Sequence, residues 1–191
     1  MEKISVMFDA PHRSGNHLAV ATLADSFPDI KFYWGYGKQH KPESFALPKE
    51  KAKHILTVLR NPLDSIISEV VVWKLQARES ILSGIDNNKK MLQSMLDNIN
   101  NIHISSFEDL TNNTSKYISD ISKILETQPV DLDYDYIKNT LQDYYGDFLY
   151  VAPIDNQAEK NAAKELLLTD YKKEVDECID LYKSLQQYVI Q

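Results

Sequence analysis

The sequence of 191 residues contains one cysteine, Cys178, and no apolar run long enough to cross a bilayer. A single cysteine excludes an internal disulfide and fits a reducing compartment. Strand-forming residues begin at Ile4, which leaves no room for a signal peptide. These absences predict a soluble, cytoplasmic protein with no membrane span. The place of Cys178 in a C-terminal helical pattern predicts a buried structural thiol rather than a nucleophile.

Positive charge is scarce, and arginine is scarcer still. The net charge of −7 argues against non-specific nucleic-acid binding, which needs a basic surface. A polyanionic ligand would therefore need a local positive pocket. Only three of the 21 basic residues are arginines: Arg13, Arg60 and Arg78. Because lysine supplies most of the positive charge, an arginine in a loop indicates a specific role. Arg13 and Arg60 both follow predicted strands.

Strand and helix patterns alternate along the chain. Strands are expected at 4–8, 29–36, 54–59 and 101–107, and helices from Asn16, at 63–77, 79–98, 114–126 and 134–145, and from Asn156 onward in two pieces that meet near Thr169. Such alternation indicates an α/β protein with a parallel sheet. The length and average apolar content predict one domain over residues 1–191 with a proper core.

The stretch Ile4–Leu18 contains the first candidate site. Its strand stops at Pro11, which removes a ladder donor, and a helical pattern begins at Asn16. Gly15 lets the backbone between them pass close to a neighbour. A strand, a tight loop and a helix aim backbone N–H groups at one point, where the helix dipole and Arg13 add positive charge. Two interpretations stay open, an anion site and an ordinary turn. The Gly-Lys-Ser/Thr ending of a Walker A motif is missing.

A second junction follows the continuous apolar strand at 54–59, a pattern typical of a parallel strand buried on both faces. This strand ends in Arg60-Asn61-Pro62. Asn61 suits the N-cap of the next helix, Pro62 its first position, and Asp64 the first turn, where the helix dipole favours an acid.

Four segments in chain order together resemble the sulfotransferase family, P-loop-related enzymes that use 3′-phosphoadenosine-5′-phosphosulfate (PAPS). They are PHRSGNH at 11–17, KQHKP at 38–42, LRNPLDSIIS at 59–68 and ISSFEDL at 104–110. They are similar to the family's Lys/Arg-Ser-Gly-Thr-Thr loop, its Lys-Thr-His-x-Pro element, its Arg-Asn/Asp-Pro-x-Asp signature with a following serine, and its Tyr-Glu-Asp-Leu element. The resemblance covers roughly 4–125. It implies a P-loop-like three-layer sandwich around a mostly parallel sheet, with a helical C-terminal part.

The resemblance also implies the activity, which is transfer of a sulfuryl group from PAPS to a hydroxyl or amine acceptor by in-line displacement. Negative charge spreads over the equatorial oxygens in such a reaction, so positioning and electrostatics dominate. The implied nucleotide-binding residues are Arg13, Ser14, Gly15, Asn16 and His17 at the 5′-phosphosulfate, with the Asn16 side chain as a further donor, and Arg60 and Ser68 at the 3′-phosphate. No metal is implied.

The implied catalytic residues are Arg13, Lys38 and His40. Arg13 takes the place of the basic residue that stabilises the transferred group and the bridging oxygen, and Lys38 helps to neutralise that group. His40 is the implied general base, and a neutral imidazole suits this task at cytoplasmic pH. The alternative for His40 is an exposed loop histidine.

Other residues allow a second interpretation. His17 could donate to a phosphate, or could cap or pack the helix. Trp73 is predicted to lie in the core, and Glu108-Asp109 is predicted to be a strand exit and helix lead-in rather than a carboxylate pair. A final set of aromatic residues could line an acceptor pocket or pack in the core: Tyr144, Tyr145, Phe148 and Tyr150.

One region departs from the family pattern. Many members have a late loop with Arg, Lys and Gly that closes over the 3′-phosphate, whereas residues 151–164 contain only Lys160 and Lys164. A lysine is a point charge rather than a planar fork of donors, so weaker nucleotide binding or a different closure is expected.

The short chain favours a small-molecule, glycan or peptide acceptor. A non-catalytic binding or structural protein with this fold is the alternative function; the missing Walker A ending speaks against a kinase.

Overall fold

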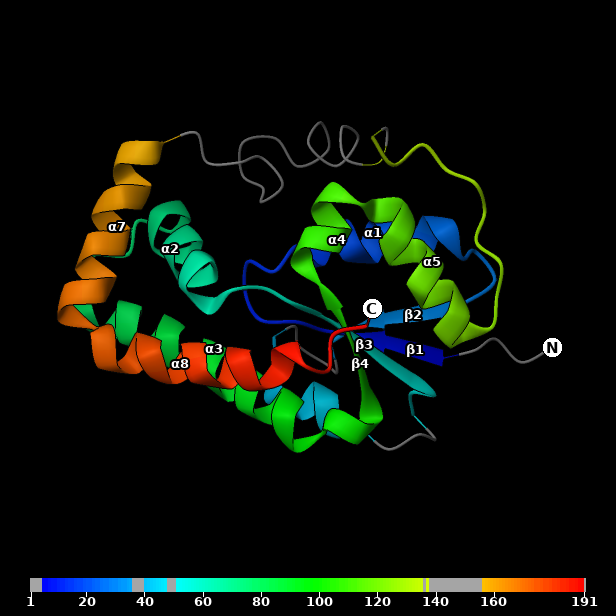
Figure 1. Ribbon diagram of the computed structural model, residues 1–191, viewed down its shortest axis with the longest axis horizontal. Helices are drawn as coiled ribbons and strands as arrows, with labels where there is room; N and C mark the ends of the chain where they lie inside the picture. The colour runs from blue at the N-terminus through cyan, green and yellow to red at the C-terminus, as the bar shows by residue number, and fades with distance from the viewer. Residues whose placement is uncertain (1–4, 36–39, 48–50, 136, 138–155, 191) are drawn as a thin grey trace.

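The structure is a computed structural model that describes residues 5–35, 40–47, 51–135, 137 and 156–190. Its centre is a four-stranded sheet made of β1 (Ser5–Phe8), β2 (Lys31–Trp34), β3 (His54–Leu59) and β4 (Ile102–Ser106). All neighbouring strands are parallel, in the order β2-β1-β3-β4 (Figure 1). This confirms the prediction of an α/β protein with a parallel sheet.

The strand register brings the carboxyl ends of the strands to one edge. Phe8, the last residue of β1, pairs with Trp34 of β2 and with Leu56 of β3. β3 continues to Leu59, which pairs with Ser106 at the end of β4. The segments that leave β1, β3 and β4 therefore start on the same side of the molecule.

Helices cover both faces of the sheet (Figure 1). One face carries α1 (Asn16–Ser26), α4 (Phe107–Asn112) and α5 (Thr114–Leu125). The other carries α2 (Pro62–Val72), α3 (Arg78–Asp97) and α8 (Lys172–Gln186), with the short 3₁₀ helices η1 (Pro42–Ala46) and η2 (Ile99–Asn101). α7 (Gln157–Asp170) packs on α2 and α8, away from the strands. The arrangement is compatible with the expected three-layer sandwich.

Alternating side chains of the strands divide the core into two clusters. Val6 and Phe8 of β1 pack with α1 and α5, whereas Met7 between them packs with the α2–α3–α8 layer. β3 alternates in the same way, with Ile55 and Leu56 in different clusters. A central strand that is apolar at successive positions is thereby buried on both faces, as its sequence predicts.

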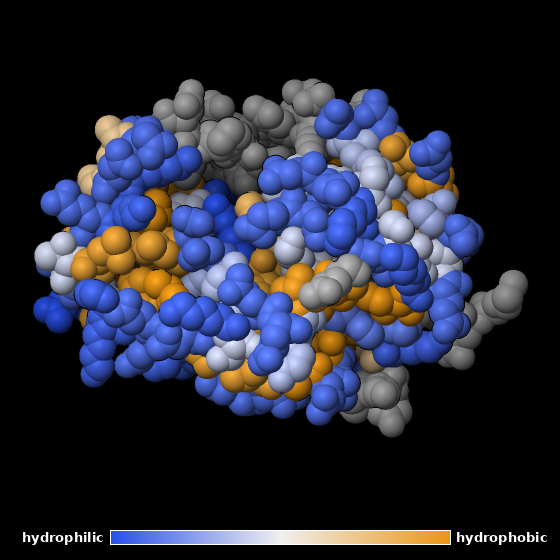
Figure 2. All heavy atoms as spheres, viewed as in Figure 1, coloured by the Kyte–Doolittle hydropathy of each residue, from blue (hydrophilic) through white to orange (hydrophobic). Residues whose placement is uncertain are grey.

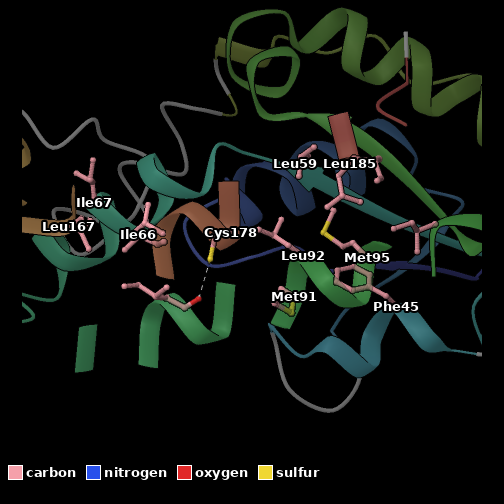
Figure 3. Packing of buried hydrophobic residues seen from close by; sticks show 14 of the residues in the cluster. Phe45, Leu59, Ile66, Ile67, Met91, Leu92, Met95, Leu167, Cys178 and Leu185 are labelled. Carbon is pink, nitrogen blue, oxygen red and sulfur yellow. Dashed lines mark hydrogen bonds between the residues drawn. The ribbon is translucent and has the colours of Figure 1, made fainter. Parts of the chain in front are cut away.

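Cys178 lies in the cluster formed by Met7 and the α2–α3–α8 layer (Figure 3). Its side chain is buried on α8, and its Sγ–H donates to the Ile85 carbonyl of α3 over 3.7 Å. Burial raises the pKa of the thiol to about 12. The prediction of a buried structural thiol is confirmed, because a protonated, enclosed thiol is a poor nucleophile.

The start of α2 follows the sequence signals. The Asn61 side chain accepts a hydrogen bond of 3.0 Å from the Leu63 N–H, Pro62 is the first helical residue and Asp64 is in the first turn. The end of α2 does not follow them, since the helix stops at Val72 rather than near Ala77. The next residue, Trp73, is 39% exposed, so the prediction of a core position for Trp73 was wrong.

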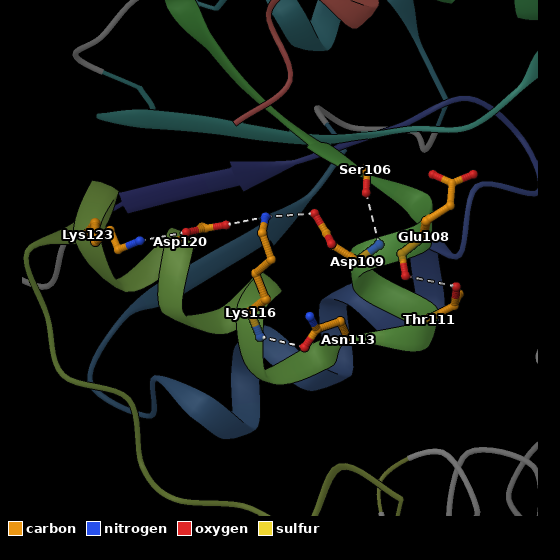
Figure 4. A network of polar contacts seen from close by, with 8 residues as sticks. All are labelled: Ser106, Glu108, Asp109, Thr111, Asn113, Lys116, Asp120 and Lys123. Atoms are coloured by element: carbon orange, nitrogen blue, oxygen red, sulfur yellow. Dashed lines mark hydrogen bonds and ion pairs between the residues drawn. The ribbon is translucent and has the colours of Figure 1, made fainter. Parts of the chain in front are cut away.

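A polar network joins α4 to α5 on the other face (Figure 4). The Ser106 hydroxyl caps α4 by accepting a hydrogen bond of 2.9 Å from the Asp109 N–H. Lys116 then bridges Asp109 and Asp120 with two contacts of 2.9 Å. The segment at Glu108-Asp109 is thus a helix start, as expected from the sequence, and its two carboxylates do not act as a pair.

The tail folds as the two predicted helical pieces, α7 and α8, which meet at Tyr171. Beyond α8 the chain returns to the sheet, where the Ile190 N–H donates to the Ile104 carbonyl of β4 over 2.9 Å. On the face viewed in Figure 2, hydrophilic side chains predominate and apolar ones show between the helices. Among the described helices, none has the length and apolar character to span a membrane.

Candidate functional site

The candidate site is a pocket at the carboxyl edge of β1 and β3. α1 leaves β1 towards one face of the sheet, and α2 leaves β3 towards the other. Open parallel sheets bind ligands in the crevice that such divergent connections create. The pocket has a volume of about 410 Å³. Its lining consists of His12, Arg13, Gly15, Asn16, His17, Leu18, His40, Arg60, Trp73, Phe107 and Thr111.

The loop from β1 to α1 has the close approach that its sequence predicts. Gly15 is the N-cap of α1 with φ +74°, and a Cβ there would lie 3.0 Å from Leu110 Cδ2 of α4. The first helical hydrogen bond runs from the Ala19 N–H to the Gly15 carbonyl. The N–H groups of the residues between them therefore precede the helical ladder at the positive end of the helix dipole.

Two polar side chains of this loop behave differently. The Asn16 side-chain amide donates to the Pro11 carbonyl over 3.0 Å, so this donor is engaged in holding the loop rather than pointing outward for a ligand. The Ser14 hydroxyl is fully buried and has no hydrogen-bond partner among the described residues. Ser14 is not among the residues that line the pocket, so this enclosed hydroxyl is not placed to contact a ligand there.

The two arginines predicted to share a site do meet there. Arg60 Nη1 donates to the Arg13 carbonyl, and the Arg60 guanidinium lies 4.3 Å from the centre of the Phe107 ring. Arg13 Nε donates to the Ser68 hydroxyl of α2 over 2.9 Å. Ser68 thus contacts Arg13 rather than Arg60. Burial lowers the pKa of Arg60, while the carboxylates of Asp64 and Glu108 oppose this effect.

His40 lies against the end of β1. Its Nδ1 is 2.8 Å from the Ala10 carbonyl oxygen, which can only accept a hydrogen bond. Nδ1 therefore carries a proton, and in the neutral ring the lone pair is on Nε2. Arg13 and His40 also share an unusual backbone, with φ of 60° and 57°. Backbone strain of this kind persists only where the surrounding contacts enforce it, and it is typical of functional sites.

The pocket continues from His40 along a series of rings. The His12 ring is 4.0 Å from the His40 ring and 5.3 Å from that of Trp73, while His17 packs edge-on against Trp34 at 4.6 Å. Burial, reinforced by nearby positive groups, lowers the pKa of His12 to about 4, and burial also lowers the pKa of His17. Both rings are therefore neutral at pH 7, and Arg13 and Arg60 provide the positive charge of the pocket lining.

Sequence reasoning missed two buried carboxylates beside this pocket. Asp9 follows β1 and carries no site motif, yet its carboxylate accepts hydrogen bonds from the segment that contains His40. Glu69, next to Ser68 on α2, is 3% exposed and faces Asn88 of α3. An acidic residue inside an apolar helix stripe is the signal that could have identified Glu69. Asp9 had no comparable signal, since its partners lie far along the chain.

Several predictions concern residues that the structure does not describe. These residues are Lys38, most of the helix expected at 134–145, and the aromatic residues Tyr144, Tyr145, Phe148 and Tyr150. Lys160 and Lys164 lie on α7, which packs against α2. Within the described part of the chain, no cluster of three His, Cys, Asp or Glu side chains is arranged to hold a metal ion.

No protein-family model, curated protein or solved structure matches this chain. The chemistry of the pocket therefore carries the functional assignment.

Proposed function

We propose that this chain is a sulfotransferase, which moves a sulfuryl group from PAPS to a hydroxyl or amine acceptor. The observation that carries the proposal is the convergence of Arg13 and Arg60 on one pocket, beside a histidine with an open ring nitrogen. Had the two guanidinium groups lain at opposite ends of the molecule, no single nucleotide could have contacted both.

The residues of the pocket fit a polyanionic nucleotide. The two guanidinium groups and the N–H groups at the N-terminus of α1 supply the donors and the positive charge, while His12 and His17 are neutral. The volume of about 410 Å³ lies within the range of roughly 300–1,000 Å³ typical of ligand pockets. The net charge of −7 makes such a local positive site conspicuous.

Each residue has a defined task in the proposed reaction. When bound, PAPS supplies the sulfuryl group and leaves as 3′-phosphoadenosine-5′-phosphate. The N–H groups at the start of α1 hold anionic oxygens, and Arg60 holds a second anionic group at the end of β3. Arg13, oriented by its bond to Ser68, stabilises the charge that spreads during transfer. His40 takes the proton of the acceptor hydroxyl on Nε2.

The first experiment measures ligand-induced thermal stabilisation. A ligand at 100 times its dissociation constant stabilises the folded state by about 2.7 kcal/mol, which raises the melting temperature measurably. We expect 3′-phosphoadenosine-5′-phosphate to produce this shift and Mg-ATP not to. Arg60→Ala should abolish the shift, whereas Arg78→Ala, at an exposed position at the start of α3, should leave it unchanged. Stabilisation by Mg-ATP alone would favour a kinase. The absence of a shift with either nucleotide would favour a non-catalytic protein.

The second experiment measures transfer of label from sulfur-35 PAPS to phenol, sugar and peptide acceptors. Arg13→Ala should reduce the rate on the order of 10²–10³-fold through lost charge stabilisation. His40→Ala should reduce it by roughly 10²–10⁴-fold while 3′-phosphoadenosine-5′-phosphate still binds. An unchanged rate in the His40 variant would remove this residue as the base.

A further inference from the structure

We propose that Asp9 is the positioning residue of the site, because its buried carboxylate holds His40 in place and keeps the proton on Nδ1. The inference rests on the proposed function only where it calls His40 the base. The placement of the ring is testable without turnover.

The Asp9 carboxylate is fully buried and accepts four hydrogen bonds. Oδ1 accepts from the N–H groups of Ala10 and His40, each over 3.0 Å. Oδ2 accepts from the Ser44 hydroxyl over 2.7 Å and from the Lys41 N–H over 3.3 Å. Three of these donors belong to one short segment, so the carboxylate joins the end of β1 to the segment at 40–44.

This anchoring accounts for the strained backbone of His40. A non-glycine residue in the left-handed region costs about 1 kcal/mol or more and needs contacts that enforce it. The His40 and Lys41 N–H groups that donate to Asp9 lie on either side of the His40 Cα, where the strained φ of 57° occurs. The carboxylate thus holds the backbone at the residue whose side chain enters the pocket.

The same carboxylate favours the protonated form of Nδ1. Asp9 Oδ1 lies 3.8 Å from His40 Nδ1, so its negative charge stabilises a proton there, in addition to the hydrogen bond to the Ala10 carbonyl. Among the described residues, the other charged or titratable groups around the ring are His12 and His17, which interact electrostatically with His40, and Arg13 and Lys41, which interact with the adjacent His12. Only Asp9 is a carboxylate, so among these groups only Asp9 can favour the tautomer with a lone pair on Nε2.

The decisive variant is Asp9→Asn, which keeps the shape but replaces one oxygen with a donor. In one orientation the new NH₂ faces the N–H groups of Ala10 and His40. In the other orientation the NH₂ faces the Lys41 N–H, which cannot accept, and the Ser44 hydroxyl, which can rotate to accept a hydrogen bond from it. Either way the segment loses part of its anchor and Nδ1 loses its counter-charge. Asp25→Asn, at an exposed position of α1, is the matched control.

The measurement is the tautomer of His40, from multiple-bond ¹H–¹⁵N spectra of histidine-labelled protein, assigned with His40→Gln. We expect the wild type and Asp25→Asn to show the Nδ1–H tautomer in the neutral ring, and Asp9→Asn to show a mixture. In the transfer assay, kcat of Asp9→Asn should fall about 10-fold or more, while KM for PAPS and the shift with 3′-phosphoadenosine-5′-phosphate stay close to wild type.

An unchanged tautomer and kcat in Asp9→Asn would overturn the proposal. If Asp9→Asn lacks a cooperative melt, Ser44→Ala decides, because it keeps the carboxylate and removes the 2.7 Å bond from the Ser44 hydroxyl. This variant should give a smaller change of the same sign, and no change would equally overturn the proposal. If the wild type neither binds the nucleotide nor transfers sulfate, the proposed function fails, and the tautomer comparison still decides the role of Asp9.

Discussion

Two buried carboxylates flank the pocket, and they are compensated very differently. Asp9 accepts four hydrogen bonds, three of them from one segment, whereas Glu69 accepts one of 3.3 Å, from the Asn88 side chain. Burial raises the pKa of both groups. The hydrogen bonds of Asp9 oppose this effect, while Glu69 reaches a pKa of about 7.

The difference shows that burial by itself does not determine what a carboxylate does. A carboxylate surrounded by donors organises the backbone that supplies them. A carboxylate with few donors and much desolvation keeps its proton to a higher pH instead. Asp9 is therefore a geometric anchor, and Glu69 is a group whose protonation is linked to stability.

The largest effect is expected from Asp9→Ala. Removal of the carboxylate leaves four donors without their acceptor, and each buried group that stays unpaired costs about 1–3 kcal/mol. Water can reach some of them, so we expect the free energy of unfolding to fall by about 4 kcal/mol, measured by urea denaturation at pH 7. Asp25→Ala should change it by less than about 0.5 kcal/mol. Similar small values for both variants would contradict the anchoring role of Asp9.

The second effect is a pH dependence that Glu69→Gln should remove. The pKa of Glu69 rises from its ordinary value of 4.5 to about 7 on folding, so the folded state binds this proton more tightly than the unfolded chain. The contribution of Glu69 to the free energy of unfolding therefore declines as the pH rises from 4.5 to about 7, and is level above that. The whole decline amounts to at most about 3 kcal/mol.

Urea denaturation at pH 5 and pH 8 measures this linkage. Relative to wild type, Glu69→Gln should become more stable by roughly 2 kcal/mol between pH 5 and pH 8. Glu79→Gln, at an exposed position in the first turn of α3, controls for the loss of a charge. Parallel stability curves for wild type and Glu69→Gln would show that Glu69 ionises normally in the folded protein.

The smallest effect is expected at Asp120, a carboxylate that forms ion pairs with two lysines. Partial burial of Asp120 is outweighed by hydrogen bonds from Lys123 and Lys116, which lower its pKa (Figure 4). The stabilisation is therefore present at neutral pH and is lost as the pH falls through the pKa of the folded state. Lys116 is 38% exposed, so Lys116→Met should reduce the free energy of unfolding by less than about 1 kcal/mol.

Salt distinguishes this ion pair from the buried carboxylates. The effect of Lys116→Met should shrink in 1 M sodium chloride, where the Debye length is about 3 Å. The effect of Asp9→Ala should persist there, because the Asp9 carboxylate is fully buried and salt screens its interactions little. An effect of Lys116→Met that does not change with salt would indicate that packing of the lysine stem matters more than its charge.

The local design of the two arginine-bearing junctions was predictable from the sequence. Gly15 has a positive φ and closely approaches α4, and Asn61 and Pro62 start α2 as their residue types indicate. These features depend on backbone conformations and hydrogen bonds within a few residues, so a local pattern contains them. The tail helices α7 and α8 were predictable for the same reason.

Other features depend on contacts between distant segments. The end of α2 at Val72 left Trp73 at the mouth of the pocket, although its position in the helical pattern predicted burial. Asp9 acquires its role from donors in η1 and the residues before it, and Glu69 from α3. No local pattern marks such partners, because the distance between them along the chain bears no relation to their distance in space.

The sequence by itself determined the order of strands and helices, the two loops that carry Arg13 and Arg60, and the burial of Cys178. Only the tertiary structure decided that β1 lies between β2 and β3, so that the two arginines share one pocket and a buried carboxylate holds His40 beside them. The physical reason is the range of the interactions. Periodicity and capping act over one or two turns, whereas strand pairing, desolvation and the positions of charges depend on how remote segments pack.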